Sequence, residues 1–202
     1  MVTTTFRTSC GSITNLPWYE DFEAVGAELH TDYPNAMTGG IMPCWDFTPS
    51  GSAAHMSFAY NNTYTYGGNS AGYSLCFYPG VIGGNNIVAL PVFAENISGL
   101  KMSYVTRPEG TSSNPGVFDV GYVTNVADSS SFVSVKHYSY SDFNGAYILD
   151  TVVFTNAPAG ARIAFRHKAN ASNWYWFVDS IVVDHNSSTP GPGPQPGDPC
   201  NA

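Results

Sequence analysis

The chain contains few charged residues, and positive charge is especially scarce. Only 11% of its 202 residues are charged, and lysine and arginine together number seven against fifteen acidic residues. The resulting net charge of −8 argues against nucleic-acid binding, which needs cationic side chains, and against docking on anionic lipid. A divalent cation, or a neutral ligand such as a sugar, fits this charge balance better.

Long hydrophobic runs are also missing. No apolar stretch approaches the roughly 20 residues that span a membrane, so we expect no membrane insertion. The opening letters MVTTTFRTSC lack the basic-then-apolar pattern of a signal peptide. We expect a secreted or cell-surface protein whose leader is already removed, with a cytosolic protein as the alternative.

The four cysteines include no C-x-x-C pair of the kind found in zinc and redox sites. Four cysteines allow three complete pairings, and the sequence alone does not choose among them. Cys10 and Cys44 each precede a strand-like stretch, and we favour them as the bridge. Cys76 lies in the apolar run YSLCFY and is expected to be a buried thiol, while Cys200 follows a proline-rich stretch. A disulfide would indicate an oxidising, extracellular environment.

What the chain does contain is typical of an all-β protein. Hydrophobic residues make up 43%, and 20 glycines and 14 prolines provide tight turns. Period-two patterns predict strands at 72–78, 100–106, 117–125, 131–139, 147–155, 161–169 and 174–184. Many short strands with this spacing predict an antiparallel β-sandwich of jelly-roll type.

The strand at 161–169 shows the clearest alternation. Ala161, Ile163 and Phe165 fall on one face, and Arg162, Arg166 and Lys168 fall on the other. We expect the three basic side chains to lie on a solvated face.

Composition divides the chain into three parts. Residues 1–9 form an N-terminal extension, residues 10–185 form the sandwich, and residues 186–202 form a Pro/Gly-rich linker. The letters PCNA at 199–202 echo SCGS at 9–12, so we expect the linker to lead to a further module.

Two stretches carry a resemblance to a known family. ARIAFRHKANASNWYWFVDSIVVD near the end, and PWYEDFE at 17–23, resemble the terminal strands of cleaved-adhesin domains from bacterial gingipain haemagglutinin regions. Those domains are related in fold to MAM domains and carbohydrate-binding jelly rolls. The resemblance implies a bacterial surface protein with tandem modules and a structural calcium ion near the terminal strands. A second calcium loop is not expected, because 46–55 contains one acid.

The stretch PWYEDFE crowds three carboxylates into four positions. Strand alternation would place Asp21 and Glu23 on one face and Phe22 in the core, so the two acids would repel each other. Calcium accepts several oxygen ligands and would remove that penalty. Asp179 in FVDSIV is a candidate third ligand, because an unpaired charge among apolar strand residues is costly. The resemblance assigns calcium to Glu23 and Asp179, and less directly to Asp21.

An alternative reading needs no metal ion. Asp21 and Glu23 would then be solvated edge charges, and Asp179 would pair with Arg162 or Arg166.

Catalytic signatures are weak. Sugar hydrolysis uses two facing carboxylates, but Asp119 in VFDVGY and Asp150 in ILDTVV each stand alone in their stretches. No G-x-S-x-G nucleophile elbow occurs. The sequence therefore favours a non-catalytic module, with a glycoside-active enzyme as the weaker alternative.

A binding module needs only a platform of aromatic and polar side chains. Tyr60, Tyr64 and Tyr66 alternate with amides and glycines, and Trp174 follows Asn173 at a loop-to-strand junction. These five residues are the candidate ligand site, for a glycan or for a host or matrix surface protein. The remaining alternative is a spacer or protein-interaction module in a tandem surface protein.

Overall fold

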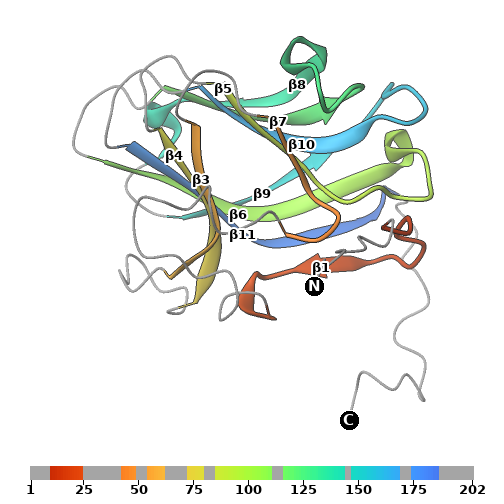
Figure 1. Cartoon of the computed structure of the whole chain (residues 1–202), viewed down its shortest axis with the longest axis horizontal. Helices are drawn as coiled ribbons and strands as arrows, with labels where there is room; N and C mark the ends of the chain where they lie inside the picture. Colours follow the sequence, from red (N-terminus) through yellow and green to blue (C-terminus); the bar gives the residue numbers. More distant parts are fainter. Residues whose placement is uncertain are drawn as a thin grey trace, which may run out of the picture.

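The computed structural model describes residues 10–24, 42–48, 54–61, 72–79, 85–110, 116–143, 147–168 and 174–186; for 54–61, 78, 79, 110 and 174 it describes the backbone alone. These residues form two antiparallel sheets stacked in a jelly-roll sandwich (Figure 1). The predicted fold class is confirmed. Among the described residues, no helix is long and apolar enough to cross a membrane.

One sheet has six strands in the order β3-β4-β11-β6-β9, with β1 pairing with β11. Its strands are β1 (Trp18–Glu20), β3 (Ala54–Asn61), β4 (Tyr73–Pro79), β6 (Leu100–Gly110), β9 (Ile148–Val153) and β11 (Trp174–His185). The first and last strands of the domain are therefore neighbours, as the carboxylate hypothesis requires.

The other sheet has five strands in the order β2-β5-β10-β7-β8. Its strands are β2 (Asp46–Thr48), β5 (Asn85–Ala89), β7 (Val117–Val123), β8 (Phe132–Tyr138) and β10 (Arg162–Lys168). The described connections include the 3₁₀ turns η2 (Ile97–Gly99), η3 (Ser129–Ser131) and η4 (Tyr140–Asp142). In Figure 1 the five-stranded sheet lies above, and β6, β11 and β1 lie below.

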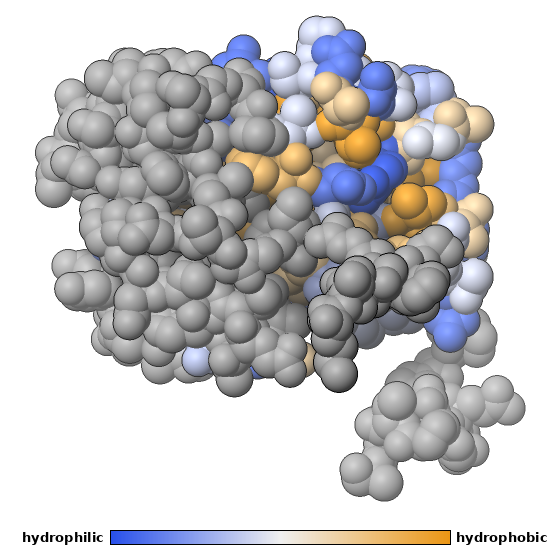
Figure 2. Space-filling model, viewed as in Figure 1, coloured by the Kyte–Doolittle hydropathy of each residue, from blue (hydrophilic) through white to orange (hydrophobic). Residues whose placement is uncertain are grey.

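The core lies between the two sheets and is rich in aromatic rings. Phe118 of β7 stacks on Trp176 of β11 with ring centroids 4.9 Å apart, and on Phe165 of β10 at 5.8 Å. All three side chains are fully buried, and each such burial stabilises the fold by about 1.5–3 kcal/mol. On the outside, the described part of the face in Figure 2 shows hydrophobic and hydrophilic residues interspersed.

The predicted disulfide is confirmed, because Cys10 and Cys44 are bonded to each other. The bridge closes a loop with a sequence separation of 34, which stabilises the fold by about 3–4 kcal/mol in the chain-entropy description. Cys76 is a buried free thiol, as expected, and burial raises its pKa. Cys200 lies outside the described residues.

The arginines of β10 differ from the sequence prediction. Ile163 and Phe165 face the core and the arginines lie on the outer face as expected, but Arg162 and Arg166 are largely covered rather than solvated. Their side chains are only 12% and 17% exposed, and they pair with Asp46 and Asp119 respectively. The alternation was predicted correctly, but the acids on neighbouring strands could not be foreseen from the alternation of β10 alone.

Candidate functional site

Strand pairing brings the predicted carboxylates to one place. In the register of β1 and β11, Glu20 lies opposite Ile181. Beyond this pair the backbone of both strands departs from regular geometry. Phe22 and Ser180 have φ of 61° and 51°, and β11 has a bulge between Asp179 and Val182. The backbone turn at Phe22 buries its ring completely, which confirms the predicted core anchor.

The same turn changes how the acidic side chains are arranged. Strand alternation stops at Glu20, so the expected sharing of a strand face by Asp21 and Glu23 is wrong in its geometry. Asp21 Oδ1 instead accepts a hydrogen bond from the Glu23 N–H at 3.2 Å. Glu23 Oε1 accepts one from the Tyr73 N–H of β4 at 2.7 Å. Glu23 therefore links the opening strand to β4 as well as lying near β11.

Gly72 makes room for this carboxylate. A Cβ atom at Gly72 would clash with Glu23 Oε1, so another residue here would force the end of the glutamate side chain to move. Asp179 Oδ1 accepts a hydrogen bond from the Ser180 N–H at 2.5 Å. Glu23 is thereby held at the start of β4, and Asp179 lies at the bulge in the middle of the neighbouring strand β11.

The electrostatics show that the acids act on one another. Burial raises the pKa of Asp179 to about 6; the Ser180 N–H opposes the rise, and the charges of Glu23 and Asp21 add to it. Burial likewise raises the pKa of Glu20. Among the described residues, no lysine, arginine or histidine pairs with these carboxylates. The described residues therefore place no paired cation beside the negative charge of this cluster.

The alternative in which Asp179 pairs with Arg162 or Arg166 is wrong. Both arginines lie in the other sheet and are held by other acids, as described above. Within the described part of the chain, no three His, Cys, Asp or Glu side chains converge closely enough to hold a metal ion as they stand.

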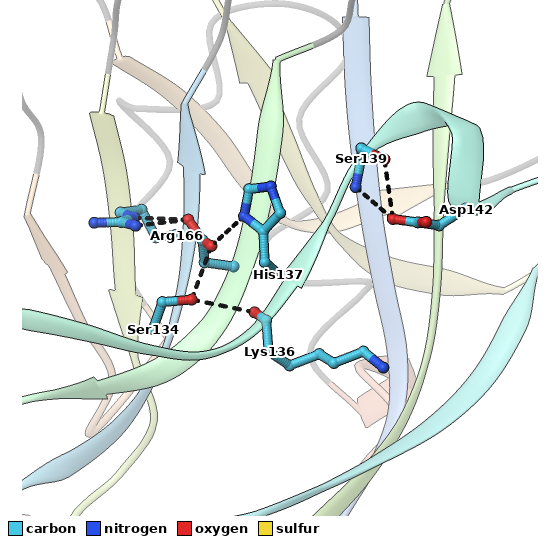
Figure 3. A network of polar contacts seen from close by, with 7 residues as sticks. Ser134, Lys136, His137, Ser139, Asp142 and Arg166 are labelled. Carbon is cyan, nitrogen blue, oxygen red and sulfur yellow. Dashed lines mark hydrogen bonds and ion pairs between the residues drawn. The ribbon is translucent and has the colours of Figure 1, made fainter.

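A second polar cluster lies on the outer face of the five-stranded sheet (Figure 3). Asp119 of β7 is 1% exposed, and Arg166 donates to its Oδ2 from Nε at 3.0 Å and from Nη2 at 2.7 Å. The Ser134 hydroxyl donates to Oδ1 at 2.9 Å, and His137 Nδ1 lies 2.8 Å from the same oxygen. Although burial opposes the charged form, the hydrogen bonds from His137, Arg166 and Ser134 lower the pKa of Asp119.

This cluster contains a serine, a histidine and an aspartate, but not in the geometry of a catalytic triad. In a triad the histidine lies between the serine and the aspartate. Here Ser134 and His137 both bind Asp119, so no base activates the hydroxyl. The cluster is an ionic and hydrogen-bonded network that joins β7, β8 and β10.

Asp150 lies in the other sheet and has its own partners. Its Oδ2 accepts a hydrogen bond from the Tyr138 hydroxyl at 2.6 Å and lies 3.2 Å from Lys136 Nζ. Tyr138 is in turn 2.5 Å from the Tyr104 hydroxyl, so the chain of contacts ties β8 to β9 and β6. Asp119 and Asp150 belong to separate networks, as their separate sequence contexts suggested.

The predicted ligand residues cannot be placed as side chains. Tyr64, Tyr66 and Asn173 lie outside the described residues. Tyr60 lies in β3 and Trp174 opens β11, and for both only the backbone is described. The ligand site of the sequence analysis stays a prediction.

Comparison with known protein families found no match, and comparison with curated protein sequences found none either. Solved structures that share the fold include three cleaved adhesin domains. The K1 cleaved adhesin domain of Lys-gingipain from Porphyromonas gingivalis W83 aligns with a TM-score of 0.59 and 16% identity, over 86% of this chain and 100% of that domain.

The K2 and K3 cleaved adhesin domains of Lys-gingipain align with TM-scores of 0.54 and 0.53 and identities of 14% and 18%. The K2 alignment covers 85% of this chain and 99% of that domain, and the K3 alignment, from P. gingivalis W83, covers 83% and 96%. At these identities the likeness concerns the fold alone: this chain has the fold of the cleaved adhesin domains of Lys-gingipain.

Proposed function

We propose that this chain is a non-catalytic extracellular binding module that attaches to a glycan. The observation that carries the proposal is the shared fold with the cleaved adhesin domains, which extends over most of the chain. The Cys10–Cys44 bridge supports an oxidising, extracellular setting. Asp119 and Asp150, the two acids considered for hydrolysis, are each engaged by neighbouring side chains, which supports a non-catalytic role.

Binding of the module to an array of immobilised glycans tests this function directly. We expect saturable binding to a subset of glycans, with no release of sugar from soluble glycosides. Turnover that is abolished by Asp150→Asn would overturn the non-catalytic assignment. Absence of glycan binding would favour the second candidate, a spacer or protein-interaction module.

A structural calcium ion is the second part of the proposal. Glu23 and Asp179 would hold the ion, with Asp21 as a further ligand. All three offer carboxylate oxygens, which hard cations prefer, and the Tyr73 N–H holds Glu23 at the start of β4, the strand next to β11. The ion would neutralise the mutual repulsion and join β1 to β4 and β11, so its contribution would be stability. These side chains would need to rotate toward the ion.

Melting curves with and without chelator test the calcium proposal. Calcium at about 100-fold above its Kd should raise the melting temperature by about 5–10 °C. Asp179→Asn should remove the increase, and Asp184→Asn on the same strand should keep it. Identical wild-type melting curves in calcium and in chelator would remove the ion from this account.

A further inference from the structure

The outer face of the six-stranded sheet contains a buried arginine. Side chains at even positions of β6, such as Tyr104 and Thr106, face the core, so Arg107 points to the opposite side of the sheet. Its side chain is nevertheless only 3% exposed. Arginine is rarely buried, and the chain has only seven basic residues in total, so the placement needs an explanation.

Aromatic rings surround the Arg107 guanidinium. Its Cζ atom lies 4.8 Å from the ring centre of Tyr147, which precedes β9, and 5.5 Å from that of Phe177 on β11. Phe177 in turn stacks with Tyr175, with centroids 6.1 Å apart and an angle of 12° between the planes. Glu109 forms an ion pair with Arg107.

Strand register makes these side chains one continuous surface. Phe177 lies opposite Arg107, and Tyr175 lies opposite Glu109. Arg107 and Phe177 are buried, while Tyr175, Tyr147 and Glu109 are partly exposed around them. The result is a partly exposed rim of Tyr175, Tyr147 and Glu109 around the buried Arg107 and Phe177.

This surface is adjacent to the carboxylate cluster. Asp179 follows Phe177 by two residues on the same face of β11. Burial raises the pKa of Tyr147. The charge of Arg107 opposes this rise, and the charge of Asp179 adds to it. In the other direction along β11, Tyr175 directly follows the predicted ligand residues Asn173 and Trp174.

We propose that Tyr175, Tyr147, Glu109 and Arg107 form a binding platform for a sugar ring. Rigid aromatic rings present flat apolar faces to the C–H faces of a sugar, and the partly exposed Glu109 carboxylate accepts hydrogen bonds from its hydroxyls, with the buried Arg107 behind them. Arg107 is held in place by two rings and Glu109, so little entropy is lost on binding. The inference rests on the proposed function, since it names the surface through which the module binds its glycan.

Variants at the rim test the platform, because they avoid the buried arginine. The glycan that binds best on the array is prepared as a soluble oligosaccharide, and its affinity for each variant is measured by isothermal titration calorimetry. We expect Tyr175→Ala and Glu109→Gln each to weaken binding at least tenfold. Tyr19→Ala is the matched control: it removes a tyrosine that is 65% exposed on β1 of the same sheet, and affinity should stay within twofold.

Melting curves of each variant confirm that the fold is intact. If the wild type binds glycans and both rim variants bind equally well, the platform is wrong while the proposed function stands. If the wild type binds no glycan on the array, the platform and the proposed glycan-binding function are both wrong. If Tyr19→Ala weakens binding as much as Tyr175→Ala does, the site lies elsewhere on the sheet and the platform is likewise wrong.

Discussion

The outer faces of the two sheets differ in how their acidic side chains are paired. On the five-stranded sheet, Arg166 and Arg162 each meet an acid, and the Asp119 carboxylate receives four hydrogen-bonding contacts. On the six-stranded sheet, the charges of Glu23 and Asp21 act on the partly buried Asp179. The first arrangement is complete within the chain and therefore structural. In the second, no cation among the described residues pairs with the carboxylates, and the proposed calcium ion would supply the missing positive charge.

The largest expected effect on the free energy of unfolding is on the five-stranded sheet, where Asp119 and Arg166 are paired. Asp119→Asn should destabilise the fold by about 2–4 kcal/mol, because it leaves the largely buried Arg166 without its counter-charge. Urea unfolding measures the change. A loss below about 1 kcal/mol would mean that the network contributes little, and the contrast between the faces would fail.

The opposite sign is expected on the other face. Without divalent cations, Asp179→Asn should stabilise the fold at pH 7 by about 1–2 kcal/mol, because it removes a carboxylate whose pKa is raised to about 6. Asp184→Asn on the same strand is the control and should change little. Destabilisation by Asp179→Asn in chelator would show that the charge is already compensated.

The two faces should also respond to pH in opposite directions. The folded pKa of Asp179 lies above its usual value, so the folded state holds the extra proton and stability falls as pH rises from about 4 to 6. The pKa of Asp119 is lowered, so its contribution is present above pH 4 and is lost on further acidification. Unfolding free energies of the wild type, Asp179→Asn and Asp119→Asn in chelator, measured from pH 3 to 7, separate the two contributions. Parallel profiles for the three proteins would contradict this difference.

The smallest effect is expected at His137. Its side chain is 58% exposed, so the contact with Asp119 is well screened by solvent. His137→Ala should cost about 0.5–1 kcal/mol, with Arg166 and Ser134 still holding the carboxylate. Thermal unfolding beside Asp119→Asn gives the comparison, and a loss equal to that of Asp119→Asn would make the histidine the centre of the network.

Much of the fold could be predicted from the sequence. All seven predicted strands occur, because period-two alternation marks strands with one buried face. β5 was missed: its letters NNIVA follow a Gly-rich turn signal, and four of its five residues are buried, so it shows no alternation. The three-residue β2 is too short to carry a periodic signal.

The site was predictable only in part. The proximity of Glu23 and Asp179 followed from pairing the first strand with the last. The turn at Phe22 could not be foreseen, because a positive φ at a phenylalanine has no sequence signal. The acidic partners of Arg162 and Arg166 lie on other strands, and cross-strand neighbours depend on register, which cannot be read from the sequence.

Isothermal titration of chelator-treated protein with calcium tests the central claim most directly. The account predicts one saturable binding event in the wild type, unchanged in Asp119→Asn and lost in Asp179→Asn. Absence of binding heat at several temperatures, or equal binding by Asp179→Asn, would contradict it.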